Sequence, residues 1–239
     1  LYENRKNVKA AIIVWDQQEK YLDRKHVIEA AWNWINMTIP VISSTFASFS
    51  RMCKNLGAET LGHLFIDEAG QALPQAAVGA IYRSRHVMVV GDPLQIKPVL
   101  TLDSNTLYML GEHFGVTEKY LSASASAQIL ADAASQYGFY RKQDKAEDSW
   151  VGIPLWVHRR CRYPMFTISN MISYDGFMVQ GMEKYGKADW FDVGGMANNK
   201  YVEEQGEFLL HKLKEMIDKN PKILDKKEKD VVYVITPFS

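Results

Sequence analysis

Two acidic side chains and a glutamine follow two apolar segments of the sequence. Asp67 and Glu68 end the segment LFIDE at 64–68, and Gln95 follows the segment VMVVGD at 87–92. Of two adjacent carboxylates, one can organise a hydrated Mg²⁺ while the other takes a proton from an attacking water. A glutamine amide can orient that water or sense a terminal phosphate, because it both donates and accepts hydrogen bonds. These residue types predict metal-assisted phosphoryl transfer.

Parallel strands would bring these side chains to one edge of a sheet. Buried parallel strands are apolar at consecutive positions, and the segments with this property are 40–45, 63–67 and 86–92. Residues 74–84 begin with proline, a favoured first residue of a helix, and are long enough to cross between parallel strands. Ligands of such sheets bind at the C-terminal ends of the strands. The side chains at those ends are Asp67, Glu68, Asp92 and Gln95.

Further elements are expected along the rest of the chain. Residues 8–15 suit a buried strand or the edge of a helix, and 16–36 predict a helix that Pro40 ends. The other expected elements are helices near 124–137, over 164–173 and over 203–220, and a strand and turn over 231–239. Trp15, Trp32, Trp34 and Trp150 are expected to pack in a core or between domains rather than to stack on bases.

Asp67 and Glu68 alone also have an ordinary structural interpretation, because acids are common as N-caps and in the first turn of helices. Together with GDPLQIKP at 91–98, however, the segment LFIDEAGQ at 64–71 resembles motifs II and III of superfamily 1 helicases. Their patterns are DEA-[GS]-Q and GDxxQLxP, and Ile96 replaces the usual leucine.

The resemblance implies an α/β fold with a RecA-like parallel sheet flanked by helices, of the P-loop NTPase type. It also implies ATP and Mg²⁺ as cofactors. Asp67 would hold Mg²⁺ through water, Glu68 would act as the general base, and Gln95 would sense the γ-phosphate. Gln71 and Asp92 would lie against the bound nucleotide.

Two further segments would meet nucleic acid. VISSTFAS at 41–48 is similar to motif Ic, in which Ser44 and Thr45 would hold a backbone phosphate. Read alone, it is equally a strand end that these two residues cap. VVYVITPFS at 231–239 is similar to the family's ITPY segment, and the corresponding nucleic-acid contacts are Thr236 and Pro237.

Residues 155–176 resemble motif IV of the nonsense-mediated-decay-helicase-like branch of superfamily 1, in the wording of a bacterial subset. The resemblance puts Arg160 in the phosphate-contacting place and Arg159 where the family has tyrosine, and it implies that Arg159 also lies at the nucleotide. Arginine suits the first role because its planar fork clamps phosphate and stabilises transition-state charge. If a strand continues here, the two side chains point to opposite faces. The alternative is a solvated basic turn.

Composition limits the possible partners. The 239 residues carry 28 basic and 28 acidic side chains, so phosphate contacts must be local rather than driven by a global field. Two separated cysteines make a disulfide framework or a cysteine zinc site improbable and suit a reducing cytoplasm. The apolar runs are too short to span a membrane.

The expected organisation is a first RecA-like domain over 1–150 and the beginning of a second over 151–239. By resemblance the function is ATP-dependent movement along, and unwinding of, DNA or RNA. The sequence has no GxxxxGK[ST] loop to cradle phosphates and does not begin with methionine, which favours a fragment of a longer helicase. The alternative is a noncatalytic helicase-like module that binds nucleic acid or protein.

Overall fold

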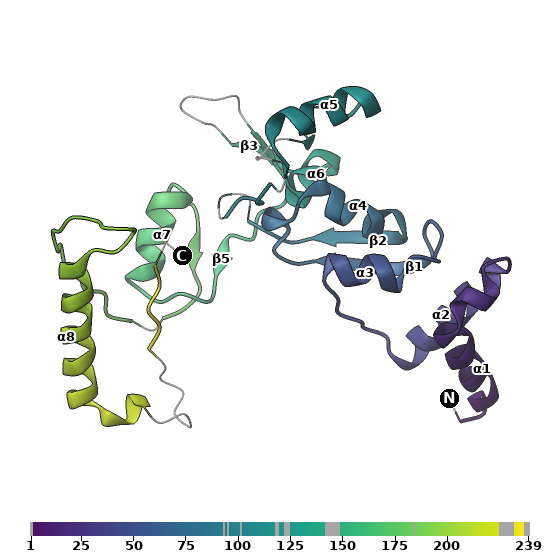
Figure 1. Ribbon diagram of the computed structural model, residues 1–239, viewed down its shortest axis with the longest axis horizontal. Coiled ribbons are helices and arrows are strands. Elements are labelled where there is room, and N and C mark those ends of the chain that lie inside the picture. The colour runs from purple at the N-terminus through teal and green to yellow at the C-terminus, as the bar shows by residue number, and fades with distance from the viewer. Residues whose placement is uncertain are drawn as a thin grey trace. The chain divides into compact units, whose positions relative to one another are not determined.

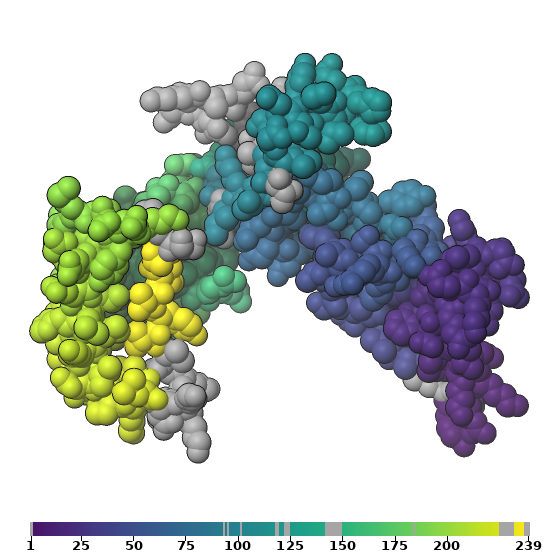
Figure 2. Space-filling view, in the orientation of Figure 1, coloured from purple at the N-terminus to yellow at the C-terminus, as the bar shows by residue number. Residues whose placement is uncertain are grey.

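The computed structural model is a mixed α/β structure with short parallel sheets and helices (Figure 1). It describes residues 2–92, 94, 96–100, 102–117, 120–121, 125–141, 149–183, 185–224 and 232–236. The chain divides into two compact units, residues 1–156 and 157–239, which run from purple to teal-green and from green to yellow in Figure 2. The assignment of these units to helicase domains stays a prediction.

The N-terminal region is helical. Helix α1 (Arg5–Asp16) is followed by the 3₁₀ helix η1 (Gln18–Tyr21) and helix α2 (Lys25–Thr38). The single helix expected over 16–36 is therefore wrong, because the chain turns twice between residues 16 and 25. Helix α2 buries Ile28, Ala31, Trp32 and Ile35, whose spacing follows one face of a helix. Trp32 packs in a core with Ile28, Cys53 and Leu56, which confirms the core role expected for this tryptophan.

The strand expected over 40–45 is wrong. This segment has no regular secondary structure, and the Val41 side chain is 82% exposed. Helix α3 (Phe46–Met52) begins directly after it. A β-branched run becomes a strand only where another strand satisfies its backbone groups. Within the described residues no strand pairs with 40–45.

The expected strand–helix–strand unit is confirmed. Strands β1 (Leu61–Ile66) and β2 (Ser84–Val89) are parallel, and helix α4 (Pro74–Tyr82) connects them with Pro74 in its first turn. In register, Leu61 pairs with Ser84 and Ile66 with Val89. One face of the sheet is covered by α4 and by helix α6 (Ala127–Ala134), around a core of Ile66, Ala69, Ala77 and Ala127.

The opposite face of this sheet is open. Phe65 is 69% exposed and Met88, its register partner, is 56% exposed. His63 and His86 are also register partners on this face, with ring centroids 5.0 Å apart. A parallel sheet is usually covered on both faces, whereas the described residues cover only one face of this sheet.

The first unit also contains helix α5 (Ser104–Phe114) and the antiparallel pair β3 (Phe139–Arg141) and β4 (Ser149–Val151). The Asp103 carboxylate accepts a hydrogen bond from Thr106 N–H at 3.0 Å, and Gly115 ends α5 in the left-handed conformation. Both are ordinary helix-end signals that could have predicted α5. Helix α6 falls within the helix expected near 124–137.

The second unit contains the short parallel pair β5 (Val157–His158) and β6 (Val179–Gln180), with helix α7 (Met165–Ser173) between them. The Asn170 amide binds both backbone groups of Met178, donating at 2.9 Å and accepting at 3.0 Å. Helix α8 (Glu203–Lys219) follows, then the 3₁₀ helix η4 (Pro221–Leu224). Residues 232–236 have no regular structure, so the strand expected there is wrong.

No helix among the described residues has both the length and the apolar character needed to cross a bilayer.

Neighbouring residues of β1 test which face of the sheet carries the core. Ile66→Ala should lower the free energy of unfolding by about 2–5 kcal/mol, because it removes a buried side chain from a packed cluster. Phe65→Ala should change it by only about 0.5 kcal/mol, as is usual for exposed positions. Urea denaturation followed by circular dichroism measures both. A larger loss for Phe65→Ala than for Ile66→Ala would mean that the open face is covered in solution.

Candidate functional site

Two segments leave the C-terminal ends of β1 and β2 side by side. Asp67 and Glu68 follow β1 directly, and Asp92 lies three residues beyond the end of β2. Val90 N–H donates to the carbonyl of Ile66 at 2.8 Å, and the Val90 carbonyl accepts from Ala69 N–H at 3.0 Å. The sheet pairing therefore continues past the strands, and the predicted acids emerge from one edge.

Two glycines allow the close approach of these segments. A Cβ atom on Gly70 would collide with the carbonyl oxygen of Asp92. A Cβ atom on Gly91 would lie 2.6 Å from the nitrogen of Gly70 and 2.7 Å from that of Ala69. Both positions therefore require glycine for the observed backbone contact.

Glu68 has an unusual backbone conformation. Its φ and ψ are 53° and 37°, in the left-handed region, and its N–H donates to Asp67 Oδ1 at 3.0 Å. Gln71 Nε2 donates to Glu68 Oε2 at 3.1 Å across the 3₁₀ helix η2 (Ala69–Gln71). The predicted nucleotide contact Gln71 therefore orients the predicted base.

The simple capping interpretation of these acids does not hold. The N-cap of α4 is Leu73, which makes no side-chain capping bond. Asp67 and Glu68 are exposed and lie before η2, away from the first turn of α4. Their carboxylates are therefore available to a ligand.

Asp92 shapes the second segment. Its Oδ1 accepts a hydrogen bond from Leu94 N–H at 3.0 Å, which closes a turn after β2. Gln95, the predicted γ-phosphate sensor, lies outside the described residues, so its role stays a prediction.

The donor set fits a hydrated Mg²⁺ better than a protein-caged metal. Among the residues that the structure describes, no three His, Cys, Asp or Glu side chains gather where they could hold a metal ion. Mg²⁺ usually keeps several waters and binds through one or two carboxylates together with phosphate oxygens. A role for Asp67 as a single ligand through water is compatible with this arrangement.

Ser44 and Thr45, the predicted phosphate contacts, organise the start of α3. Thr45 Oγ1 accepts from Ser48 N–H at 3.3 Å and caps the helix, while Ser44 Oγ donates to the Thr45 carbonyl at 2.9 Å. Thr45 is therefore a capping residue, as the alternative interpretation expected. It caps the start of helix α3 and not the end of a strand. Both side chains are exposed, and their contact with nucleic acid stays a prediction.

The predicted arginines lie in the second unit, in a turn that follows β5. Cys161 N–H donates to His158 Nε2 at 2.8 Å, which closes the turn 158–161. Because β5 ends at His158, the strand alternation expected to separate Arg159 from Arg160 does not apply. Both side chains are exposed, and within the described part of the chain neither has an ion pair. In this structure both arginines therefore lie in a solvated basic turn, which was the alternative interpretation of this segment.

Sequence reasoning missed His158, which holds this turn. Its ring accepts the Cys161 bond and packs against Phe166 of α7, with ring centroids 5.4 Å apart. Its place before two arginines gives no sign of this role, because the contact with α7 is not local in sequence. The remaining predicted nucleic-acid contact, Thr236, lies in the irregular segment 232–236, and Pro237 falls outside the described residues.

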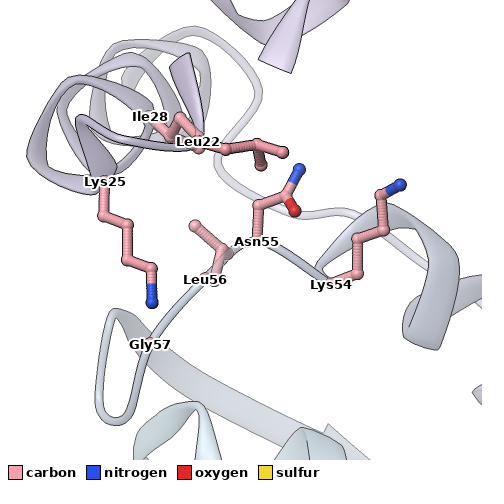
Figure 3. A pocket seen from close by; sticks show the side chains of 7 residues that line it. All are labelled: Leu22, Lys25, Ile28, Lys54, Asn55, Leu56 and Gly57. Carbon is pink, nitrogen blue, oxygen red and sulfur yellow. The ribbon is translucent and has the colours of Figure 1, made fainter. Parts of the chain in front are cut away.

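A separate hollow of about 220 Å³ lies between the start of α2 and the segment after α3 (Figure 3). Its lining residues are Leu22, Lys25, Ile28, Lys54, Asn55, Leu56 and Gly57. Lys54 pairs with Glu19 at 2.5 Å, and the Asn55 amide donates to Gln18 Oε1 at 3.2 Å. None of the predicted site residues lines this hollow, so it does not belong to the acidic site.

No protein-family model, curated protein or solved structure matches this chain. The interpretation of the acidic site therefore depends on its own geometry and on the motifs that it contains.

The two cysteines should differ in reactivity. Burial raises the pKa of the Cys53 thiol to about 11, although the nearby Arg83 guanidinium favours the thiolate. Cys161 is half-buried, in the same turn as the arginines. At pH 8, below the raised pKa, only ~10⁻³ of Cys53 is thiolate, so iodoacetamide should label Cys161 at least ~10²-fold faster. Peptide mass spectrometry over time measures both rates. Equal rates in the folded chain would contradict the burial of Cys53.

Proposed function

We propose that this chain is the middle part of an ATP-dependent nucleic-acid helicase or translocase of superfamily 1, with a RecA-like first domain and the beginning of a second. One observation carries the proposal. The backbone segment that carries Asp67 and Glu68 and the segment that carries Asp92 are in contact at the C-terminal edge of a parallel sheet. This is the edge at which open α/β sheets bind ligands, and phosphoryl transfer requires acids there.

In the proposed mechanism Glu68 is the general base. The Gln71 amide occupies one carboxylate oxygen, Oε2, and leaves the other free to accept a proton from water. Asp67 would hold Mg²⁺ through water, and the ion would supply charge neutralisation on the phosphates of ATP. Asp67 also accepts the Glu68 N–H, so the two acids are fixed relative to each other.

The second unit would supply positive charge. The resemblance assigns Arg160 the contact with the terminal phosphate, and its exposed side chain in the turn 158–161 is available to an incoming anion. Ser44, Thr45 and Thr236 would contact the backbone of single-stranded or partly duplex DNA or RNA. Cycles of ATP binding and hydrolysis would then alternate grip and release of the strand.

A noncatalytic helicase-like module is the second candidate. One observation favours it, namely that residues 1–239 contain no GxxxxGK[ST] segment. The amides and lysine of that loop normally supply most of the phosphate contacts. The two candidates differ in a simple way. Only the helicase requires such a loop in a longer protein that contains these residues, and only the helicase hydrolyses ATP through Glu68.

Glu68→Gln tests the proposed base. In a form of the protein that includes the phosphate-binding loop, ATP should still bind, while turnover should fall by a factor on the order of 10²–10⁴. The amide is nearly isosteric with the carboxylate but cannot accept the proton. Steady-state hydrolysis and calorimetry with Mg-ATP measure the two effects separately.

Glu59→Gln is a matched control for this variant. Glu59 is an exposed glutamate with φ 54°, in the same backbone region as Glu68 at 53°, and its side chain lies outside the proposed site. Its replacement should leave turnover unchanged. Normal turnover of Glu68→Gln would overturn the assignment of the base, and the noncatalytic candidate would be preferred if no form of the protein hydrolyses ATP.

The adjacent arginines should be separable by substitution. Arg160→Ala should lower kcat by at least ~10²-fold with a smaller change in ATP affinity, because a guanidinium aimed at developing charge acts mainly in the transition state. Arg159→Ala should act mainly on packing or nucleic-acid contact. Turnover of both variants at saturating nucleic acid is the measurement. A collapse for Arg159→Ala with normal turnover for Arg160→Ala would shift the assignment by one residue.

A further inference from the structure

Glu68 adopts a backbone conformation that its residue type disfavours. Its φ of 53° lies in the left-handed region, where a Cβ atom crowds the following carbonyl. Such a conformation persists only where the surroundings impose it, and it directs the side chain differently from an extended or right-handed residue. The question is therefore which contacts hold Glu68 in this state.

Val90 binds the chain on both sides of the acidic pair. Its N–H donates to the carbonyl of Ile66, just before Asp67, and its carbonyl accepts from Ala69 N–H, just after Glu68. The two bonds, of 2.8 and 3.0 Å, fix both ends of a two-residue excursion. Asp67 and Glu68 must bulge outward between them, and the left-handed turn at Glu68 brings the chain back to Val90.

Gly91 allows the two segments to approach closely enough for both Val90 bonds to form. Gly91 contacts the backbone of Ala69 and Gly70, where a Cβ atom would come within 2.6 to 2.7 Å of two nitrogens. Cβ atoms essentially never approach closer than 3.0 Å, so a side chain at Gly91 would force the two segments apart. The atoms in conflict are backbone and cannot swing away as a flexible side chain would.

We propose that Gly91, in contact with Gly70, is a positioning residue that holds Glu68 in the left-handed conformation and so couples the direction of its carboxylate to the Asp92 segment. The inference rests on the proposed function only in the role given to Glu68. It names the backbone contact that positions the base of the same site.

Gly91→Ala in the 239-residue chain tests the coupling by NMR. Glu68 should leave the left-handed region, as read from its Cα chemical shift and its three-bond HN–Hα coupling, and the Ala69 amide should exchange at least ~tenfold faster. Amides within the β1–β2 ladder should keep their protection. In a form that hydrolyses ATP, the same variant should lower kcat with little change in KM, because it moves the base and not the nucleotide contacts.

Gly62→Ala is the matched control, because Gly62 lies in β1 and an added Cβ there meets no atom within 4 Å. It should change neither the Glu68 signals nor the exchange of Ala69. Gly70→Ala would place a Cβ atom against the Asp92 carbonyl, in the same backbone contact. It should therefore displace Glu68 in the same way.

The unsubstituted chain provides a measurement that needs no variant. If Val90 couples the two segments, the Ala69 and Val90 amides should open together and show the same exchange protection. Independent opening, with Ala69 ~tenfold or more less protected than Val90, would overturn the coupling even if Gly91→Ala failed to fold. Unchanged Glu68 signals in folded Gly91→Ala would overturn it as well.

These outcomes are separate from those of the proposed function. The NMR measurements require no nucleotide, so they report on the coupling alone. Normal hydrolysis by Glu68→Gln would remove the catalytic role of Glu68 and leave the measured coupling in place. An unmoved Glu68 in Gly91→Ala would remove the coupling and leave the role of Glu68 open to its own test.

Discussion

The paired backbone bonds of Val90 are the interaction on which the acidic site depends. Parallel strands leave polar backbone groups at their ends, and these groups need partners. Here the segment after β2 supplies them for the segment after β1, through Ile66 and Ala69. The pairing places two carboxylates at the edge of the sheet. The glycines at 70 and 91 then permit a distance that no other residue type would allow.

The sequence predicts this unit well because its signals are local. Apolar residues at consecutive positions mark β1 and β2, and Pro74 marks the start of the helix between them. The same signal fails at 40–45, where pairing with a distant strand would be required and does not occur among the described residues. The left-handed backbone of Glu68 was equally unpredictable, since it results from bonds to Val90 that the local sequence does not encode.

The candidate contacts outside the acidic site show the same limit. Thr45 has the residue type of both a phosphate contact and a helix cap, and the structure places it as the cap of α3. Arg159 and Arg160 were expected on opposite faces only if a strand continued through them, whereas β5 ends at His158 and the bond from Cys161 N–H to His158 closes a turn that contains both arginines. Residue type thus restricts the chemistry available at a position, while nearby backbone geometry decides where that chemistry is presented.

The acidic site and the phosphate cradle are separable parts of the proposed motor. The hydrogen bonds of Asp67 and Glu68 within the described residues lie within 66–92, so these bonds do not require a GxxxxGK[ST] loop. Among the described residues, nothing covers the face of the same sheet that carries the exposed Phe65 and Met88. A chain of this kind can hold its proposed base and proposed metal-binding acid in place without binding ATP tightly, because most of the affinity for the phosphates comes from the cradle. Correctly arranged acids are therefore necessary for the proposed hydrolysis but do not produce it on their own.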